Sequence, residues 1–280
     1  MSFDVSLGQY YEAKSPIHKL DPRTKIFFVI MFMVATFVAH EIVAFALLLA
    51  IVLVSIIISR VPLRVIFKGL KALVLVVIFT AILNVFWTKG DNILCTINVI
   101  PNRWAINIYE EGLINAGILA LRIVMLLTCT TLYLSYTTTP IELTDGIETA
   151  LAPLKKIKLP IHEFAMLMTI ALRFIPTLTD ETGKIMNAQK SRGADFSSGG
   201  LIKRAKALIP IIIPLFVSSF RRADELATAM ECRCYRGGDG RTRMKKLKFK
   251  VLDIFGLLFS LAILAGVILI SIYVPVYSIR

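Results

Sequence analysis

The chain has 280 residues, of which 56% are hydrophobic and only 18% are charged, and its mean hydropathy is +0.74. Soluble domains carry about a quarter charged residues, so this composition argues against a soluble globular protein. The net charge of +13 would favour nucleic-acid binding in a soluble protein. In a membrane protein it predicts orientation instead, because cytoplasmic loops collect Lys and Arg, and we expect no nucleic-acid partner.

The first apolar run, residues 26–58, follows a polar segment of residues 1–25. We therefore expect no cleaved signal peptide and a run that stays in the membrane as an anchor. As one helix the run would be about 50 Å long, which is too long for a single crossing. His40 and Glu41 interrupt it and predict a helical hairpin. Its two spans would be residues 26–39 and 42–58.

Three further apolar stretches follow, at residues 72–87, 112–135 and 251–274. The last two would each be about 36 Å long as helices, enough to cross a hydrocarbon core of about 30 Å with some tilt. The first is short, and it can be extended back to Ile66 if Lys68 and Lys71 direct their charged ends toward the membrane surface.

The basic residues decide the topology. They concentrate in residues 1–25, 59–71 and 137–250, and the remaining Lys and Arg are Lys89, Arg103, Arg122 and Arg280. Five crossings place all three basic segments in the cytoplasm and the C-terminus outside. Two apolar patches, 164–175 and 207–220, are short for spans, and crossing there would place basic residues outside. We expect them to lie along the membrane face or to pack on each other.

The expected fold is therefore all-α, a polytopic membrane protein with five transmembrane helices and a cytoplasmic domain of about three helices. Pro140 and Pro160 suit the first turns of two of these helices, and Pro210 and Pro214 predict a bend in the third. The expected organisation is a cytoplasmic segment (1–25), four spans (26–136), the cytoplasmic domain (137–250), and a fifth span with an outer C-terminus (251–280).

The two long cytoplasmic helices are expected to end alike, with the sequences AQKSRG at 188–193 and AMECRC at 229–234. Each has an Ala followed four residues later by an Arg that has a small residue on either side. Such an Arg can offer its planar fork to a carboxylate, while small neighbours let a partner approach closely. On the pattern alone, an Arg that only complements the helix dipole is the commoner interpretation. The candidate docking residues are Ala188, Ser191, Arg192, Gly193, Ala229, Cys232, Arg233 and Cys234.

Three segments of the chain combine into a larger pattern. The first reads SPIHKLDPRTK at 15–25. The second combines RFIP at 173–176 with AQKSRGAD at 188–195. The third combines RADELA at 222–227 with MECRCYRGG at 230–238 and RT at 241–242. Together these segments resemble one family, the transmembrane T component (EcfT/CbiQ-like) of energy-coupling factor (ECF) transporters. The resemblance covers residues 15–275, and the paired Arg motifs make it specific.

The resemblance implies a non-catalytic scaffold in an ABC-type importer of a vitamin or metal-ion micronutrient, in a bacterial or archaeal cell membrane. Its expected partners are the lipid bilayer, a substrate-binding membrane S component and two cytoplasmic ATPases, which would bind ATP and Mg. Arg192 and Arg233 would pair with acidic groups on these ATPases. Ser191 and Cys232 replace the family's usual Ala, and Cys234 stands where the family has Gly.

Other chemistry finds little support in the sequence. The phosphate-binding pattern G-x-x-x-x-G-K-[ST] is absent, so ATP hydrolysis is expected in partner subunits. Cys95, Cys129, Cys232 and Cys234 suggest neither a disulfide framework nor a complete metal site, and no metal or cofactor is expected in this chain. Arg122, inside a span, is predicted to contact the S component, to brace neighbouring helices or to extend toward the membrane surface. A conventional ABC permease with its own substrate path and an intramembrane enzyme are the alternatives.

Overall fold

The structure is a computed structural model that describes residues 10–88, 93–100, 104–153, 160–196, 200–237 and 249–273. The chain divides into two compact units, which we call the membrane unit (residues 9–146 and 247–280) and the helical unit (residues 147–246). Some residues singled out in the sequence lie outside the described part of the chain, namely Lys89, Arg103, Gly238, Arg241, Thr242 and Arg280.

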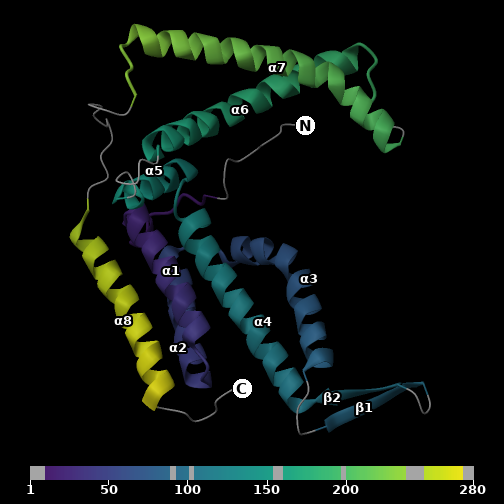
Figure 1. The fold of residues 1–280 in the computed structure, drawn as a ribbon, viewed down its shortest axis with the longest axis vertical. Coiled ribbons are helices and arrows are strands. Elements are labelled where there is room, and N and C mark those ends of the chain that lie inside the picture. The colour runs from purple at the N-terminus through teal and green to yellow at the C-terminus, as the bar shows by residue number, and fades with distance from the viewer. Residues whose placement is uncertain are drawn as a thin grey trace. The chain divides into compact units, whose positions relative to one another are not determined.

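Helices dominate both units (Figure 1). The membrane unit contains η1 (Ile17–Lys19), α1 (Pro22–Val38), α2 (Ile42–Ser59), α3 (Leu63–Trp87), β1 (Ile93–Ile100), β2 (Trp104–Tyr109), α4 (Glu110–Thr130), the π-helical turn η2 (Thr131–Tyr136) and α8 (Val251–Tyr273). The helical unit contains α6 (Ile161–Ser191) and α7 (Leu201–Cys232), and α5 (Pro140–Ala150) crosses the boundary between the units.

The predicted break in the first apolar run is confirmed. Helix α1 ends at Val38 and α2 begins at Ile42, so the polar pair His40–Glu41 lies in the turn between them. At the other end of α1, the Asp21 side chain accepts a hydrogen bond from the Arg23 backbone N–H at 3.0 Å, and Pro22 is the first helical residue. Both features are typical of helix starts, because the first N–H groups of a helix lack backbone partners.

Arg122 of α4 holds the α1–α2 turn. Its guanidinium donates a hydrogen bond to the Ala39 carbonyl at 3.0 Å, and its Cζ atom lies 5.2 Å from the centre of the Phe45 ring. Ala39 follows the last residue of α1, where helix carbonyls have no backbone partner and a cation is favourable. Of the three roles predicted for Arg122, this geometry supports the brace between helices.

The segment between α2 and α4 has two features that were not predicted from the sequence. Helix α3 includes the extension back to Ile66 that the sequence allowed, but it bends by 57° between Lys71 and Leu73. The segment between α3 and α4, predicted only as an outer connection of an all-α fold, contains an antiparallel hairpin in which Ile93 pairs with Tyr109 and Thr96 with Asn107. β-branched residues are frequent in both strands, and such residues favour extended backbone.

The number of helices that could span a membrane reaches the five predicted crossings, but the helices are not all the ones that were predicted. Within the described residues, α2, α6, α8 and the continuous α4–η2 segment are long and apolar enough to cross a membrane, and α3 adds a fifth if its bent halves count as one span. Helix α1, with 17 residues, is shorter than each of these candidates. Helix α6 was expected in the cytoplasmic domain. The polytopic helical fold itself is confirmed.

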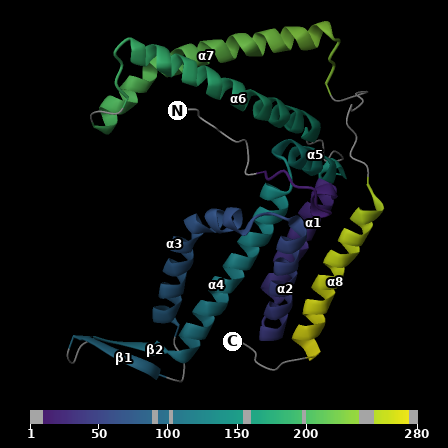
Figure 2. The ribbon, with the colours of Figure 1, turned by 180° about the vertical axis from the view of Figure 1, so that it is seen from behind.

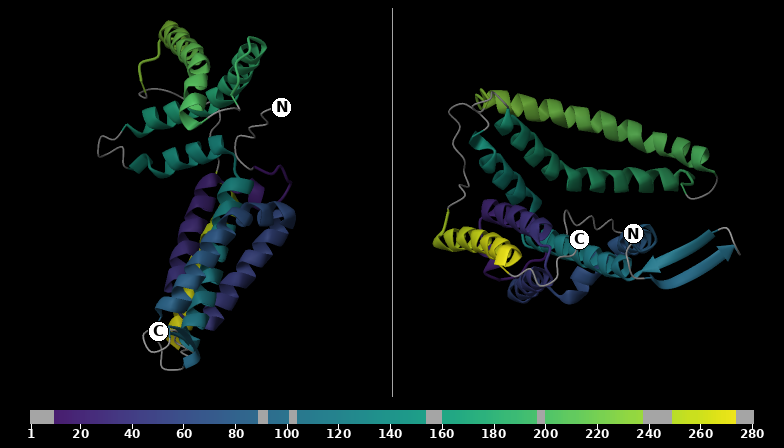
Figure 3. Two further views of the ribbon diagram at one scale, coloured as in Figure 1. Left: turned by 90° about the vertical axis from the view of Figure 1, so that its right-hand side faces the viewer. Right: turned by 60° about the horizontal axis from the view of Figure 1, so that its bottom comes forward.

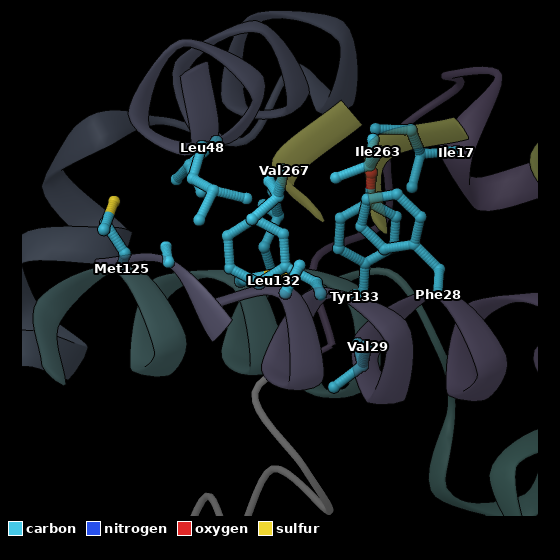
Figure 4. Packing of buried hydrophobic residues seen from close by; sticks show 14 of the residues in the cluster. Ile17, Phe28, Val29, Leu48, Met125, Leu132, Tyr133, Ile263 and Val267 are labelled. Atoms are coloured by element: carbon cyan, nitrogen blue, oxygen red, sulfur yellow. The ribbon is translucent and has the colours of Figure 1, made fainter. Parts of the chain in front are cut away.

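The core of the membrane unit lies where α1, α2, α4–η2 and α8 run side by side (Figures 2 and 3). Figure 4 shows Phe28 of α1 against Tyr133 of η2, with ring centres 4.5 Å apart, and Leu48 and Val267 nearby. The Tyr133 hydroxyl is 3.1 Å from the Ser55 hydroxyl, so its polar end has a partner in α2. Large side chains on the outer faces of these helices are exposed, as contact with lipid requires.

The segment before α1 is folded onto itself. Burial lowers the pKa of His18, which favours the neutral ring. A neutral imidazole has one donor and one acceptor, and both have partners here, since Nε2 lies 3.0 Å from the Tyr11 carbonyl and Nδ1 lies 2.7 Å from the Ser15 hydroxyl. Ser15 and Ile17 are buried, so this part of the 15–25 segment has a structural role.

Replacing two glycines of α8 should have opposite effects on stability. A Cβ atom at Gly256 would lie 2.9 Å from Thr24 Cγ2 of α1, whereas a Cβ at Gly266 would have no atom within 4 Å. Gly256→Ala should therefore destabilise the protein by about 1–2 kcal/mol through overpacking. Gly266→Ala should stabilise it by about 0.5–1 kcal/mol, because Ala favours a helix more than Gly. Thermal unfolding in detergent measures both, and shifts in the same direction would contradict the α1–α8 packing.

Arg122→Met should destabilise the membrane unit by about 1–2 kcal/mol, because it removes a charge-assisted hydrogen bond and a cation–π contact while keeping the apolar stem. The control is Arg64→Met, which removes an exposed charge of α3. Thermal unfolding of the detergent-solubilised protein provides the comparison. Unchanged unfolding of Arg122→Met, combined with loss of a co-purifying membrane partner, would instead assign Arg122 to partner contact.

Candidate functional site

The C-terminal end of α6 is closed by a tight backbone turn. The Gly193 N–H donates to the Lys190 carbonyl at 2.9 Å, and the Ala194 N–H donates to the Gln189 carbonyl at 3.0 Å. Gly193 has a φ of +88°, in the left-handed region that glycine adopts without strain. Together these features form a Schellman cap, which satisfies the last helical carbonyls. Arg192 is the residue at which the helix ends.

The end of α7 has the same geometry. The Cys234 N–H donates to the Glu231 carbonyl at 2.8 Å, and the Tyr235 N–H donates to the Met230 carbonyl at 3.0 Å. Here the left-handed position is occupied by Cys234, with a φ of +55°. Arg233 ends this helix as Arg192 ends α6. The sequence likeness of the two helix ends is therefore a likeness of backbone conformation, and Cys234 adopts it at the position of Gly193.

All eight residues predicted to dock partners are exposed, namely Ala188, Ser191, Arg192, Gly193, Ala229, Cys232, Arg233 and Cys234. In the part of the chain that the structure describes, neither Arg192 nor Arg233 makes a hydrogen bond or ion pair with its guanidinium. Both side chains therefore remain available to an external acceptor. Because the Schellman turns already satisfy the helix carbonyls, neither guanidinium is needed to cap its own helix.

The two capped ends lie at opposite ends of the α6–α7 pair. Figures 1 and 2 show α6 and α7 as an antiparallel pair, joined where α6 ends and α7 begins. Figure 3 shows the same arrangement from below. Glu181 of α6 contacts Arg222 of α7, and each of these residues lies 11 positions before the arginine of its own cap, so the two caps lie on opposite sides of this contact, each about 16 Å away along its helix. The two arginine-bearing helix ends are therefore separate surfaces and not parts of one composite surface.

A part-buried group of side-chain hydrogen bonds joins the two helices. Glu181 of α6 accepts hydrogen bonds from the Ser218 hydroxyl at 2.6 Å and from the Arg222 guanidinium at 2.7 Å, both on α7. Arg222 was noted in the sequence as part of the RADELA segment, but Glu181 was missed. The available signal was the spacing of Ser218 and Arg222, which lie on one face of a helix and can share a single acceptor.

Helix α6 is also tied to α5 within the helical unit. His162 Nδ1 lies 2.9 Å from a Glu148 carboxylate oxygen. Pro210 and Pro214 both lie inside α7, and Figures 1 and 2 show the expected bend in the part of α7 nearest its start. The bend follows from the ring of each proline, which removes a backbone donor and crowds the preceding turn.

Other candidate chemistry gains no support from the described residues. They contain no group of three or more His, Cys, Asp and Glu side chains placed to hold a metal ion. Cys232 and Cys234 are free and exposed, and Cys129 is free and buried. Arg122 belongs to the membrane unit, where it binds Ala39, and it is not part of the site formed by the two capped helix ends.

Comparison with known proteins identifies the family. Residues 13–244 match the family model described as cobalt transport protein, CbiQ. The energy-coupling factor transporter transmembrane protein EcfT of Clostridium kluyveri is 51% identical over 273 residues, which cover 96% of this chain and 98% of that protein. The proteins of the same name from Acidaminococcus fermentans and Bacillus subtilis are 44% and 45% identical, over 100% and 96% of this chain and 98% of each relative.

These matches extend from the first motif near the N-terminus through both capped helix ends, and they confirm the resemblance found in the sequence. Transporter membrane subunits of this kind are non-catalytic by family. The chain is therefore a multi-pass membrane protein that belongs to the family of energy-coupling factor transporter transmembrane proteins.

Proposed function

We propose that this chain is the coupling scaffold of an ECF-type ABC importer, which links two cytoplasmic ATPases to a substrate-binding S component in the membrane. The observation that carries the proposal is the pair of Schellman-capped helix ends, each with an exposed arginine, at opposite ends of α6–α7. Two like sites on one rigid pair of helices suit two like partners.

The chemistry of docking rests on Arg192 and Arg233. A guanidinium presents two parallel N–H donors to one carboxylate, and such a pair is strong when a partner surface excludes water from it. The chain turns away immediately after each arginine, so the helix tip can enter a groove on the partner. Ala188 and Ala229, one turn before the arginines, keep the flank of each tip narrow. ATP and Mg would be bound by the ATPases and not by this chain.

The proposed mechanism is mechanical. When the two ATPases close on ATP, the separation and orientation of their docking grooves change, and each groove carries a helix tip with it. The Glu181–Arg222–Ser218 contact resists independent sliding of α6 and α7, so the two tips move as a coupled pair. Differential contacts of the scaffold with its partners in the open and closed states then drive reorientation of the S component.

The charge distribution supports a cytoplasmic position for the N-terminus and the helical unit, where most Lys and Arg lie. In this arrangement α6 lies on the cytoplasmic side and does not cross, although its length and composition would allow it. We propose a vitamin or a metal ion as the cargo, and the family description of cobalt transport supports the second class. Uptake of ⁵⁷Co²⁺ and of tritiated B vitamins by cells with and without the chain separates these classes.

The double variant Arg192→Glu/Arg233→Glu should lose its ATPase partners and its transport activity, because each tip would then present a negative charge to an acidic groove. Each single variant should weaken assembly by about tenfold or more, which corresponds to about 1.4 kcal/mol. The measurement is the amount of ATPase that co-purifies with the tagged chain from native membranes.

The matched control for this charge reversal is Arg221→Glu, which changes an exposed arginine of α7 about three turns before Arg233 and outside both tips. It should assemble like the unmodified chain. Normal ATPase association in the double variant would refute docking through these arginines. Substrate binding by the purified chain without any S component would favour the conventional permease.

The left-handed turn after each arginine gives a second prediction about the tips. Gly193→Ala should weaken ATPase association several-fold, because a Cβ at a φ of +88° costs about 1 kcal/mol even though no atom lies within 4 Å of it. Gly183→Ala is the control, since a Cβ there also meets no atom and the helical backbone is unstrained. Cys234→Gly should preserve or strengthen association by relieving the same strain in α7. Equal affinities for the Gly193 and Gly183 variants would show that the turn geometry is unimportant for docking.

A further inference from the structure

Three helix ends of the membrane unit meet in a buried polar cluster. The ends are the starts of α1 and α8 and the end of the α4–η2 segment. Every member of the cluster is at most 6% exposed, and three of them carry side-chain charges that the proposed docking mechanism does not use. We call this group the helix-end cluster, and it consists of Asp21, Thr24, Lys25, Thr137, Thr138 and Asp253.

Asp253 joins the starts of two helices. One carboxylate oxygen accepts a hydrogen bond from the Asp21 backbone N–H at 2.7 Å, at the cap of α1. The other oxygen accepts from the Lys250 backbone N–H at 2.7 Å, at the cap of α8. The Thr24 hydroxyl lies 3.4 Å from the first oxygen. A single buried carboxylate thus satisfies unpaired N–H groups at two helix N-termini, where negative charge is favourable.

Lys25 performs the converse function at the end of the α4–η2 segment. Its ammonium group donates to the Thr137 carbonyl at 2.7 Å and to the Thr138 hydroxyl at 3.1 Å. Both threonine hydroxyls in turn donate to the Tyr133 carbonyl, at 2.9 Å and 2.8 Å. The end of a helix favours a cation, so Lys25 attaches the first turn of α1 to the two residues that follow η2.

The position of the cluster along the chain is informative. Thr137 and Thr138 lie between η2 and α5, and the chain leaves the membrane unit through α5, after Gly146. Lys250 and Asp253 lie where the chain has just returned to it, at residue 247. Within the membrane unit the first part of α5 also packs closely on α1, since a Cβ at Gly146 would lie 2.8 Å from Pro22 Cβ. The first turn of α1 therefore holds both of the connections that lead to the helical unit.

We propose that the helix-end cluster is the point at which movement of the helical unit is passed to the membrane helices, with Lys25 and Asp253 as positioning residues for energy coupling. This inference rests on the proposed function, since it requires ATPases that move α6 and α7. Buried hydrogen bonds to charged groups are stiff, so a displacement of either connection would reach α1, α8 and η2 together. Loss of the cluster would leave ATPase docking intact and remove the response of the membrane helices.

The test uses the complete complex, purified through a tagged ATPase so that only assembled transporters are measured. Hydrogen–deuterium exchange is compared between the ADP-bound and the ATP–vanadate-trapped states. This readout needs no knowledge of the transported substrate. With the unmodified chain, trapping should change exchange in α6 and α7 and also in the first turns of α1 and α8. The variants are Asp253→Asn and Lys25→Met, which each remove a charge, and Gly146→Ala, which displaces α5 from Pro22 without changing any charge.

All three variants should keep ATP hydrolysis within about twofold and keep the nucleotide-dependent change in α6 and α7. They should reduce the nucleotide-dependent change in hydrogen–deuterium exchange in α1 and α8 by about tenfold. A factor of this size is typical of coupling between two sites. The controls are Gly117→Ala, where a Cβ meets no atom within 4 Å, and Lys25→Arg, which keeps a cation that can donate to Thr137. The first should respond fully, and the second should retain most of the response.

Several outcomes would overturn the proposal. A merely stabilising cluster would raise exchange in α1 and α8 equally in both nucleotide states and leave the difference between the states unchanged. Failure of all three variants to assemble, while the controls assemble, would assign the cluster to folding rather than to transmission. If the unmodified chain responds in α6 and α7 but not in α1 and α8, the cluster proposal fails and the proposed function stands. If no ATPase associates with the unmodified chain, the proposed function fails first.

Discussion

The membrane unit depends on charges buried at helix ends. An isolated charge in a low-dielectric interior costs several kcal/mol, and each helix also leaves unpaired N–H groups at its start and unpaired carbonyls at its end. Asp253 and Lys25 solve both problems at once, because each charge is placed on the backbone groups that lack partners. Three helix ends are consequently held to one another by directional contacts, which apolar packing alone would not provide.

Arg122 applies the same principle at the other end of α1. Its hydrogen bond to the Ala39 carbonyl closes the α1–α2 turn. Helix α1 is therefore held at its start by the Asp253 carboxylate and by its own Lys25, which donates to Thr137, and at its end by the Arg122 cation. The helical unit uses the opposite arrangement. Its long helices satisfy their last carbonyls with their own backbone turns, and the arginines at these ends stay exposed. Charges in the membrane unit therefore stabilise the fold, whereas those at the helix tips are available to partners.

This division explains which features could be predicted from the sequence. Local patterns sufficed for the α1–α2 break at His40–Glu41 and for the likeness of the two helix tips, because turns and caps are determined by neighbouring residues. The contacts of Lys25 with Thr137 and of Asp253 with Asp21 join residues 112 and 232 positions apart, and no local pattern indicates them. The hairpin of β1 and β2 was missed for a different reason. Its two strands contain several β-branched residues and are separated by three residues, which is a recognisable local signal for a hairpin.

The two helix tips are alike in hydrogen bonding but not in backbone freedom. Gly193 adopts its left-handed turn without strain, whereas Cys234 adopts the same turn against the preference of any residue with a Cβ, which costs about 1 kcal/mol. The α7 tip therefore needs more stabilisation from neighbouring contacts than the α6 tip does to keep the docking conformation. Because α6 and α7 are antiparallel, the unstrained turn at Gly193 and the strained turn at Cys234 lie at opposite ends of the pair, and these two ends are not equivalent. Two identical ATPases would meet unequal tips, and two different ATPases would have a physical basis for choosing between them.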